Sequence, residues 1–447
     1  MSQAGTREPR RSLGLLDATM VGMGAMIGAG IFVLTGLAAD IAGPAAILVF
    51  LLNGVVTAFT ALSYAELAAA IPESGGGYAF VKEVFSDLVS FLMGWMLWFA
   101  YMIAGALYAL GFGSNMLEFL RVLGVRVPET LTAGPVALPA GATILGLGIV
   151  FLLVGLNALS TSASGGAETV VTLVKIAILL LFAGFGAFAA DAGEFDPLFT
   201  NGAVKLLPAM GLTFIAFEGY DLIATVTEEV KNPRENIPKA IFYSLAATIV
   251  IYLLVVFVAI GTLGAESLGA AGETAIARAA EGFMPRFPVL GTGASIIAFG
   301  AVFSTVSALN AVVLASSRVA FAMGREGQLP AVGRIHHRFG TPLRAVVASA
   351  LVMLLAVAFA PVEQVGNLSS LFFLLSFVVV NGSVIKLRRE RPNLTRPYEM
   401  PYYPLPPVLG IGLNLLLGAF IDLRIWAIGA GWLLLGGVVY LVLEQRG

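Results

Sequence analysis

One lysine lies deep inside an apolar segment of this sequence. Lys175 comes about ten residues into the hydrophobic run 166–190, so a helix rising about 1.5 Å per residue would place it near the middle of a membrane. Its side chain, about 6 Å long, cannot cross the roughly 15 Å to the headgroups, which argues against snorkelling. A charge at that depth is costly and marks a functional site by default. Because burial favours the neutral amine, Lys175 could bind and release a proton during a working cycle.

Other polar side chains could help to bind or transfer the proton of Lys175. Ser304 and Ser307 lie three residues apart on one face of the predicted helix 288–323, although a serine inside a span often bonds only to its own helix backbone. Glu168 and Thr172 share a helical stripe with Lys175. We predict that this stripe is a proton exit path. A solvated helix end is the alternative interpretation for Glu168.

A cluster of glycines interrupts the first apolar run. The stretch Met20–Gly36, MVGMGAMIGAGIFVLTG, contains five glycines, and each costs about 1 kcal/mol in a helix interior relative to alanine. Backbone groups freed in a bilayer need protein or ligand partners, and glycine-interrupted hydrophobic segments mark transporter binding sites. We therefore predict that this helix unwinds near Gly28-Ala29-Gly30, around a small polar solute. Close helix packing through small residues is the alternative.

The two sides of such a break offer different groups to a ligand. The N–H groups that begin the outer half-helix, those of Ala29, Gly30 and Ile31, would suit a carboxylate. The carbonyl groups that end the inner half-helix, those of Met26 and Ile27, would accept from an ammonium group.

Another apolar run, 204–226, the sixth along the chain, holds two acidic residues, Glu218 and Asp221. We predict a second break there, over Phe214–Tyr220, with free carbonyl groups that join the ammonium site. For Glu218 two interpretations compete: it binds a basic side chain or a proton, or it caps the broken helix, and the second is favoured. The aromatic residues assigned to this pocket are Phe214, Phe217 and Tyr220, of which Phe217 or Tyr220 would close it.

The composition assigns the chain to the membrane. Over 447 residues it is 58% hydrophobic and 12% charged, with a mean hydropathy of +0.93, whereas soluble domains carry about 25% charged residues. Runs of about 20 apolar residues mark membrane spans. We predict twelve, at 13–39, 44–70, 88–120, 141–160, 166–190, 204–226, 239–263, 288–323, 343–360, 364–388, 403–423 and 426–443.

Positive charges predict the orientation. Of the 25 lysines and arginines, 18 fall in segments that are cytoplasmic if the N-terminus is inside, six fall in external segments, and Lys175 lies within a span. By the positive-inside rule both termini are cytoplasmic, in a multi-pass protein of the plasma membrane. The polar, basic start MSQAGTREPRRS precedes a run long enough to span, which argues against a cleaved signal peptide.

The two interrupted runs are the first and the sixth. That spacing fits an inverted repeat of five plus five spans with two spans outside it. Two connecting segments have helical character: the one after the triple glycine at 75–77, and the loop 264–287, which could cap the outside. The predicted divisions are a cytoplasmic tail (1–12), a first repeat (13–190), a second repeat (191–388), a basic and proline-rich cytoplasmic loop (389–402), and spans 11 and 12 with the C-terminal tail (403–447).

Other kinds of chemistry find little support. The chain has no cysteine, which rules out disulfides and thiolate metal sites, and its two histidines, His336 and His337, lie in a basic loop without the partners of a metal site. The net charge of −2 suggests no nucleic-acid partner. Without a convergent nucleophile and base, we expect no enzyme, no catalytic residue, no cofactor and no metal. The carboxylates that remain as candidates for a gate are Glu66, Glu168 and Asp221.

Several motifs, taken in order, resemble the amino acid–polyamine–organocation (APC) superfamily of secondary transporters. They are GAMIGAGIF in the first span, YAELAAAIPESGGGYAFVKE after the second, EEVKNPRENIPKAI after the sixth and RPYEMPYYPLPP before the eleventh. LVKIAILLLFAG around Lys175 and FSTVSALNA around Ser304 are similar to the archaeal proton-coupled, broad-specificity amino-acid transporter branch.

This resemblance implies an all-α, LeuT-like fold with twelve transmembrane helices, helices 1 and 6 being broken. It implies uptake of amino acids by alternating access, with spans 1, 2, 6 and 7 moving against spans 3, 4, 8 and 9. The partners would be a small amino-acid substrate and the lipid bilayer. Ala100 stands where cationic amino-acid carriers of the family tend to place a glutamate, which favours neutral substrates, and the adjacent Tyr101 is assigned to the substrate pocket.

The resemblance also places Lys175 where sodium-coupled relatives bind sodium. Its ammonium group would contact the carbonyl groups of Gly24 and Ile27 and a hydroxyl of span 8. A second cation about 4 Å away would cost about 4 kcal/mol at an effective dielectric constant of 20, so we expect proton-coupled symport without sodium. The alternatives are a sodium-independent exchanger in which Lys175 is a fixed charge, a carrier of cationic amino acids, and a sensor that binds without transporting.

Overall fold

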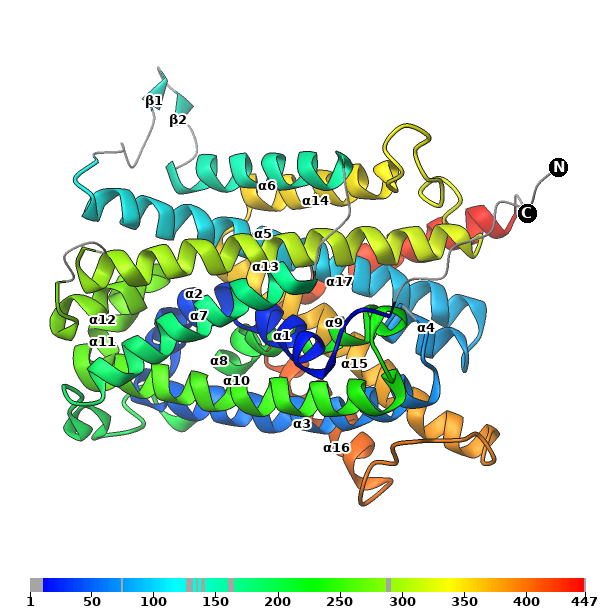
Figure 1. The fold of residues 1–447 in the computed structure, drawn as a ribbon, viewed down its shortest axis with the longest axis horizontal. Helices are drawn as coiled ribbons and strands as arrows, with labels where there is room; N and C mark the ends of the chain where they lie inside the picture. The colour runs from blue at the N-terminus through cyan, green and yellow to red at the C-terminus, as the bar shows by residue number, and fades with distance from the viewer. Residues whose placement is uncertain are drawn as a thin grey trace.

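The computed structural model describes residues 11–73, 75–125, 132–133, 136–137, 141–159, 165–286 and 291–445 (Figure 1). Most of the predicted N-terminal tail, with Arg7 and Arg10, lies outside the described residues, as do Arg126 and Arg446. Most of the described residues are in helices. Helices predominate because hydrocarbon offers no hydrogen-bond partner to a backbone group that is not bonded within its own segment.

The first repeat contains seven α-helices. They are α1 (Leu15–Met26), α2 (Ala29–Ala42), α3 (Ala46–Ala70), α4 (Gly77–Lys82), α5 (Asp87–Val122), α6 (Gly141–Leu159) and α7 (Gly165–Gly186). A 3-10 turn, Gly43–Ala45, separates α2 from α3, and a two-stranded hairpin of β1 (Thr132–Ala133) and β2 (Val136–Ala137) lies between α5 and α6.

The second repeat and the last two spans follow the same plan. They contain α8 (Leu206–Thr213), α9 (Tyr220–Thr225), α10 (Pro233–Leu263), α11 (Ala265–Ala271), α12 (Ala275–Phe283), α13 (Gly293–Arg325), α14 (Leu343–Phe359), α15 (Val362–Glu390), α16 (Leu405–Ala419) and α17 (Leu423–Glu444). The basic loop after α15 is not helical, as its prolines predict.

Twelve membrane passes follow from these bounds. In the described part of the chain, nine helical segments are long and apolar enough to span, and the shorter apolar helices α14 and α16 add two. One of the nine, Leu15–Ala70, turns at Gly43–Ala45 and so contains two passes. The predicted fold class is thereby confirmed, including its interruptions in spans 1 and 6. The predicted domain boundaries, and the side of the membrane on which the termini lie, stay predictions.

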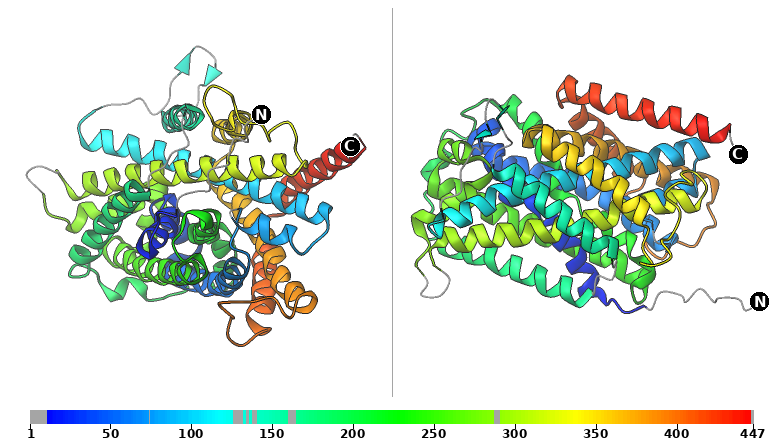
Figure 2. Two further views of the ribbon diagram at one scale, coloured as in Figure 1. Left: turned by 45° about the vertical axis from the view of Figure 1, so that its right-hand side comes forward. Right: turned by 90° about the horizontal axis from the view of Figure 1, so that it is seen from above.

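The helices form two groups that meet along their length. In one group α5 packs against α6, α13 and α14; in the other α3 packs against α8 and α10, and α1 against α9 and α10. Figure 1 shows the first group above the second, and Figure 2 shows α1 and α2 enclosed by the other helices. These groups correspond to the predicted scaffold (spans 3, 4, 8, 9) and bundle (spans 1, 2, 6, 7).

The helix is interrupted in a different way in each of the two broken spans. In span 1 the helix stops at Met26 and resumes at Ala29, slightly before the predicted centre of the break, with Gly28 at φ −105° and ψ −136°. In span 6 the helix stops at Thr213, passes through the 3-10 turn Phe214–Phe217, and resumes at Tyr220. Gly219 there has φ 134°, a conformation that side-chain-bearing residues rarely adopt.

Candidate functional site

The two breaks lie directly against each other. A Cβ atom added at Gly30 would stand 2.7 Å from the Cα of Ala216, and one added at Gly219 would stand 2.6 Å from the backbone nitrogen of Met26. Both glycines are therefore required by the close approach of the two backbones. This close contact brings the ends of four half-helices to one point in the interior.

One tyrosine bridges the two breaks. The hydroxyl oxygen of Tyr252, on α10, lies 2.5 Å from the carbonyl oxygen of Met26 and 3.0 Å from that of Ala216. The hydroxyl of Ser304, on α13, donates to the carbonyl of Ile27 at 2.5 Å. In this conformation the carbonyl groups predicted to receive a ligand ammonium thus accept from protein hydroxyls. The N–H groups of the first turn of α2, by contrast, have no acceptor within their own helix.

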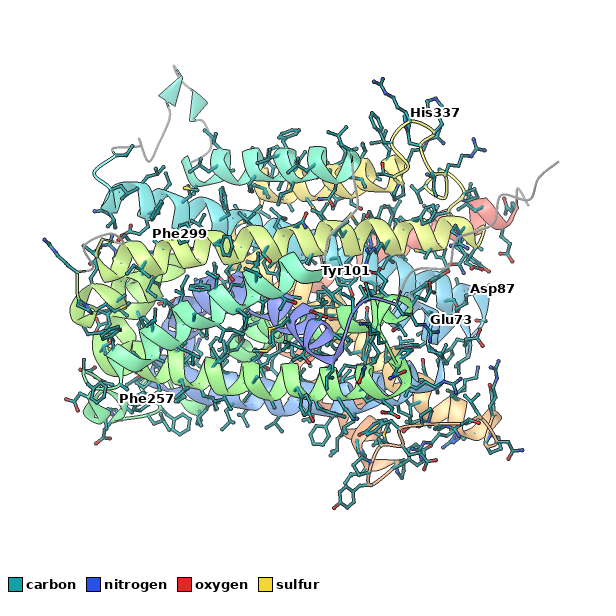
Figure 3. All side chains as sticks on the ribbon, in the orientation of Figure 1. Glu73, Asp87, Tyr101, Phe257, Phe299 and His337 are labelled. Carbon is teal, nitrogen blue, oxygen red and sulfur yellow. The ribbon has the colours of Figure 1, made fainter. Side chains whose placement is uncertain are left out.

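The aromatic residues assigned to the pocket are all buried around this point. Phe217 packs edge-on against Tyr252, with ring centroids 5.3 Å apart, and Tyr220 packs edge-on against Tyr64 at 5.5 Å. Figure 3 shows Tyr101 near the middle of the bundle, far from Glu73 and Asp87 at one end. The assigned residues buried here are Met26, Ile27, Ala29, Gly30, Ile31, Tyr101, Phe214, Phe217, Glu218 and Tyr220.

The two acidic residues of span 6 differ in their partners. Asp221 accepts from the N–H of Gly219 at 2.9 Å and from the hydroxyl of Tyr101. Glu218 is 4% exposed, and neither of its carboxyl oxygens has a hydrogen-bond partner. The preferred interpretation of Glu218 as the cap of the broken helix is therefore wrong. The acid that bonds the backbone at this break is Asp221, through the N–H of Gly219, the residue immediately before α9.

Lys175 reaches the inner half of span 1. Its Nζ atom is fully buried and lies 2.8 Å from the carbonyl oxygen of Gly24 and 3.0 Å from the Oγ of Ser307. The contact expected with the carbonyl of Ile27 is made by Ser304 instead. The proton-coupling role assigned to these residues stays a prediction.

A chain of hydrogen bonds continues from Lys175 toward one end of the protein. Ser307 donates to the Oε1 of Glu168 at 3.1 Å. Thr172, which the predicted stripe placed between the lysine and the glutamate, instead donates to the carbonyl of Met20 at 3.2 Å. The connection therefore crosses from α7 to α13 and back, and does not run down a single helix face.

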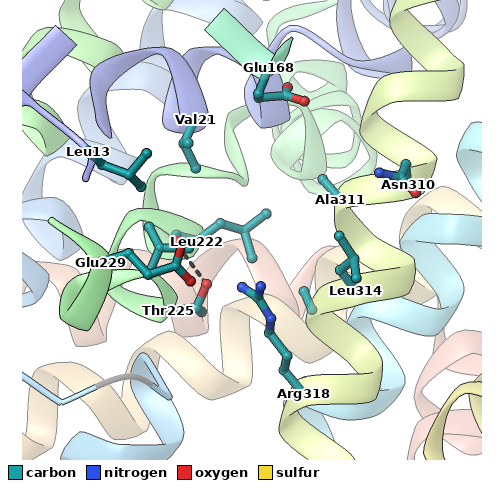
Figure 4. Close-up of a pocket in the computed structure, with 12 residues that line it drawn as sticks. Leu13, Val21, Glu168, Leu222, Thr225, Glu229, Asn310, Ala311, Leu314 and Arg318 are labelled. Atoms are coloured by element: carbon teal, nitrogen blue, oxygen red, sulfur yellow. Dashed lines mark hydrogen bonds between the residues drawn. The ribbon is translucent and has the colours of Figure 1, made fainter. Parts of the chain in front are cut away.

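Glu168 lines a pocket at the end of this chain. The pocket encloses about 100 Å³ between α1, α7, α9 and α13 (Figure 4). Val21 and Leu222 form apolar walls, and the side chain of Arg318 extends toward Thr225. The route from Lys175 thus ends in a pocket beside the inner half-helices.

Polar contacts join helices at both ends of the protein. At the end where α3 finishes, the carboxylate of Glu66 accepts two bonds from Arg388, on α15, at 2.7 and 2.6 Å, and a third from the N–H of Met400 at 2.8 Å. At the opposite end α11, a 3-10 turn and α12 (265–283), here called the lid, cover α2. The lid residue Glu273 accepts from Ser114 on α5.

No metal chemistry competes with this arrangement in the part of the chain that the structure describes. No group of three or more His, Asp or Glu residues there could hold a metal ion. His336 stacks on Phe339 at one end of the protein, and the tilted rings of the two histidines lie 4.9 Å apart. Figure 3 shows His337 on an outer loop, distant from the breaks.

Comparison with known proteins identifies the family. A profile of the amino acid permease family matches residues 13–430. This chain belongs to that family, within the amino acid–polyamine–organocation superfamily. Family membership shows that it is a multi-pass membrane transporter with small amino-acid substrates, not an enzyme.

Three relatives from Bacillus subtilis illustrate the range of this amino acid permease family. The chain is 31% identical to the branched-chain amino acid permease BcaP, over 99% of this chain and 95% of the relative. It is 30% identical to a methylthioribose transporter, over 100% and 96% of the two chains. It is 28% identical to the serine/threonine exchanger SteT, over 90% and 89%.

Sequence reasoning did not find Tyr252. It is one of two tyrosines in the largely apolar run 239–263, and nothing in the sequence separates it from an ordinary buried aromatic residue. Its role depends on two carbonyl groups that are distant in the sequence and are brought together only by the fold.

Proposed function

We propose that this permease imports neutral amino acids by proton-coupled symport, with both termini in the cytoplasm of the cell. The observation that carries the proposal is the hydrogen-bonded route from Lys175 through Ser307 to Glu168, which reaches the pocket beside the inner half-helices. A buried amine connected to a pocket can exchange a proton with it, and the bond from Lys175 to Gly24 transmits the amine's charge state to span 1.

The substrate would bind between the two breaks. Its carboxylate would meet the N–H groups of Ala29, Gly30 and Ile31, where a helix begins and no internal acceptor exists. Its ammonium group would replace the Tyr252 hydroxyl at the carbonyl groups of Met26 and Ala216. A neutral substrate is supported by Ala100, which offers no charge to a basic side chain, and by the branched-chain substrates named for a relative.

Lys175 would set which side is open. When charged, its ammonium group holds the carbonyl of Gly24 and so keeps α1 against α7 and α13. When neutral, the amine is a weaker donor and releases α1 more readily. A bound sodium ion is not needed, because the ammonium group occupies a position next to the broken helix with its own positive charge.

Uptake into proteoliposomes tests the proposal. Uptake of each of the twenty amino acids is measured with and without an inward proton gradient. Each measurement is made first at a constant sodium concentration and then without sodium. We expect the gradient to concentrate neutral amino acids such as leucine or valine inside, with no effect of sodium. Equal internal and external concentrations under the gradient would contradict proton symport.

Exchange is the second candidate, because one relative is named a serine/threonine exchanger. An exchanger would give counterflow from preloaded liposomes but no net uptake into empty ones. The same preparation therefore separates the two functions.

A further inference from the structure

Glu218 is the one acidic residue placed between the two breaks. Its chain neighbours touch span 1 on both sides of the interruption: Ala216 lies against Gly30, and Gly219 lies against Met26. The segment that carries Glu218 therefore faces the candidate substrate site, not a lipid or a loop.

This carboxyl group has no partner, unlike other buried acids of the chain. Both of its oxygens are buried without a hydrogen bond. Three residues away, Asp221 is bonded to Gly219 and Tyr101, and Glu66 is bonded to Arg388 and Met400. A charge left unpaired in such surroundings is strongly disfavoured, and the group takes up a proton instead.

The groups around Glu218 offer it no positive charge. The acidic group on α9 whose charge acts on Glu218 is the carboxylate of Asp221, and the other titratable groups coupled to Glu218 are phenol hydroxyls from α3, α5 and α9. A negative Glu218 would in turn act on the phenol groups of Tyr64, Tyr101, Tyr108 and Tyr220. Two carboxyl groups that share a buried site do not both ionise, and Asp221 has the donors that stabilise its charge.

We propose that Glu218 is a second proton-binding group, and that the amino acid binds only while Glu218 is a neutral carboxylic acid. This proposal rests on the substrate position given under the proposed function. A negative Glu218 would repel the substrate carboxylate at the start of α2. A protonated Glu218 presents an O–H donor in the same place and removes the repulsion. Substrate binding above the pH at which Glu218 ionises then draws one proton from solution.

Binding of leucine to the purified full chain across a pH series tests this directly. In the native protein we expect the affinity to fall about tenfold for each pH unit above the ionisation of Glu218, as one linked proton requires. In Glu218→Gln, which is isosteric and permanently neutral, we expect tight binding at every pH. The matched control is Glu363→Gln, the same chemical change at an exposed site on α15, which should retain the native profile.

A second measurement needs no variant at this position. When leucine is added in weak buffer at alkaline pH, the native protein should take up close to one proton for each leucine molecule bound. The same uptake is expected in Lys175→Ala, which would lose only gradient-driven accumulation, so failure of the lysine mechanism and failure of this one are separable. Three results would each overturn the proposal. They are no proton uptake at any pH, a native pH profile in Glu218→Gln, and binding of the free amino acid lysine by the native protein but not by Glu218→Gln.

Discussion

The side chain of Lys175 and the carbonyl of Gly24 join α7 to the first half-helix of span 1, α1, at a distance of 2.8 Å. Replacing this lysine by alanine removes both the proton-binding amine and the bond. We expect Lys175→Ala to fold and to bind substrate but to lose pH-driven accumulation in proteoliposomes. Lys205→Ala, an exposed lysine before α8, is the control and should accumulate normally. Retained accumulation in Lys175→Ala would remove the lysine from the mechanism.

Ser307 and Ser304 are on the same helix, yet only the first joins Lys175 to Glu168. We expect Ser307→Ala to slow gradient-driven uptake by on the order of 10²-fold, the size of effect seen when a positioned proton-transfer group is lost, while counterflow is less affected. Ser304→Ala removes a donor to Ile27 and should cost about 1–3 kcal/mol of stability without this selective loss. The comparison is made on initial rates with and without the gradient, and equal effects of the two variants would argue against the route.

Gly30 allows the two broken helices to touch. A methyl group there meets the backbone of Ala216 at 2.7 Å, and backbone cannot yield as a flexible side chain does. We expect Gly30→Ala to abolish measurable uptake and to lower the stability by about 1–3 kcal/mol, as overpacking does.

Gly148 on α6 provides the matched control for that substitution. A Cβ atom there has nothing within 4 Å, so Gly148→Ala should transport normally and gain up to about 1 kcal/mol from the better helix propensity of alanine. Thermal unfolding in detergent and uptake assays on both variants check the pair; normal uptake by Gly30→Ala would show that the breaks need not touch.

The ion pair between Glu66 and Arg388 fixes α3 to α15. Glu66 is 2% exposed and also lies 3.6 Å from the Nε of Arg396, so Arg388→Met would remove its two short bonds and leave the longer ion pair and the N–H of Met400. We expect a loss of about 1–3 kcal/mol in the free energy of unfolding, much of it recovered in the double variant Glu66→Gln/Arg388→Met, because breaking a buried pair costs more than replacing it. Denaturant unfolding of the two variants gives the numbers, and no difference between them would contradict this assignment.

Glu273 makes closure of the lid depend on pH. Burial under the lid raises the pKa of Glu273, and the bond from Ser114 opposes that rise. A raised pKa means that the closed lid favours the protonated acid, so closure is strongest at low pH and weakens as pH rises through that pKa.

Cysteine labelling can measure this, since the chain has no native cysteine. Leu37→Cys, next to the Gly36 that the lid covers, should react faster with a maleimide as pH rises. Adding Glu273→Gln should keep the reaction slow at every pH. Identical pH dependence with and without Glu273→Gln would show that another group controls the lid.

The sequence predicts the fold of this protein well because the membrane makes each span visible as an apolar run. The break in span 6 could also be predicted, since Glu218 and Asp221 beside Gly219 are incompatible with a plain lipid-facing helix. The break in span 1 was predicted within about two residues, and its exact position depends on contacts with Ala308 and Ala216 that the sequence does not contain.

Contacts between residues that are distant in the sequence were much harder to predict than the positions of the helices along the chain. Lys175 could be assigned to a site from its depth alone, but its bond to Ser307 and not to Ile27 depends on how α13 lies against α7. The capping role predicted for Glu218 was wrong for a similar reason: the backbone turn at Gly219 places the N–H of that residue 2.9 Å from the carboxylate of Asp221, which had been predicted only as a candidate gate.

The Tyr252 hydroxyl shares a single proton between the carbonyl groups of Met26, the last residue of α1, and Ala216, in the 3-10 turn that interrupts span 6. The two breaks are consequently held together at their common centre by the hydrogen bonds of one hydroxyl group. A ligand that brings its own donors to those oxygens can replace the Tyr252 hydroxyl without breaking any other contact. Binding of a ligand at the centre therefore frees the half-helices of both broken spans at the same time.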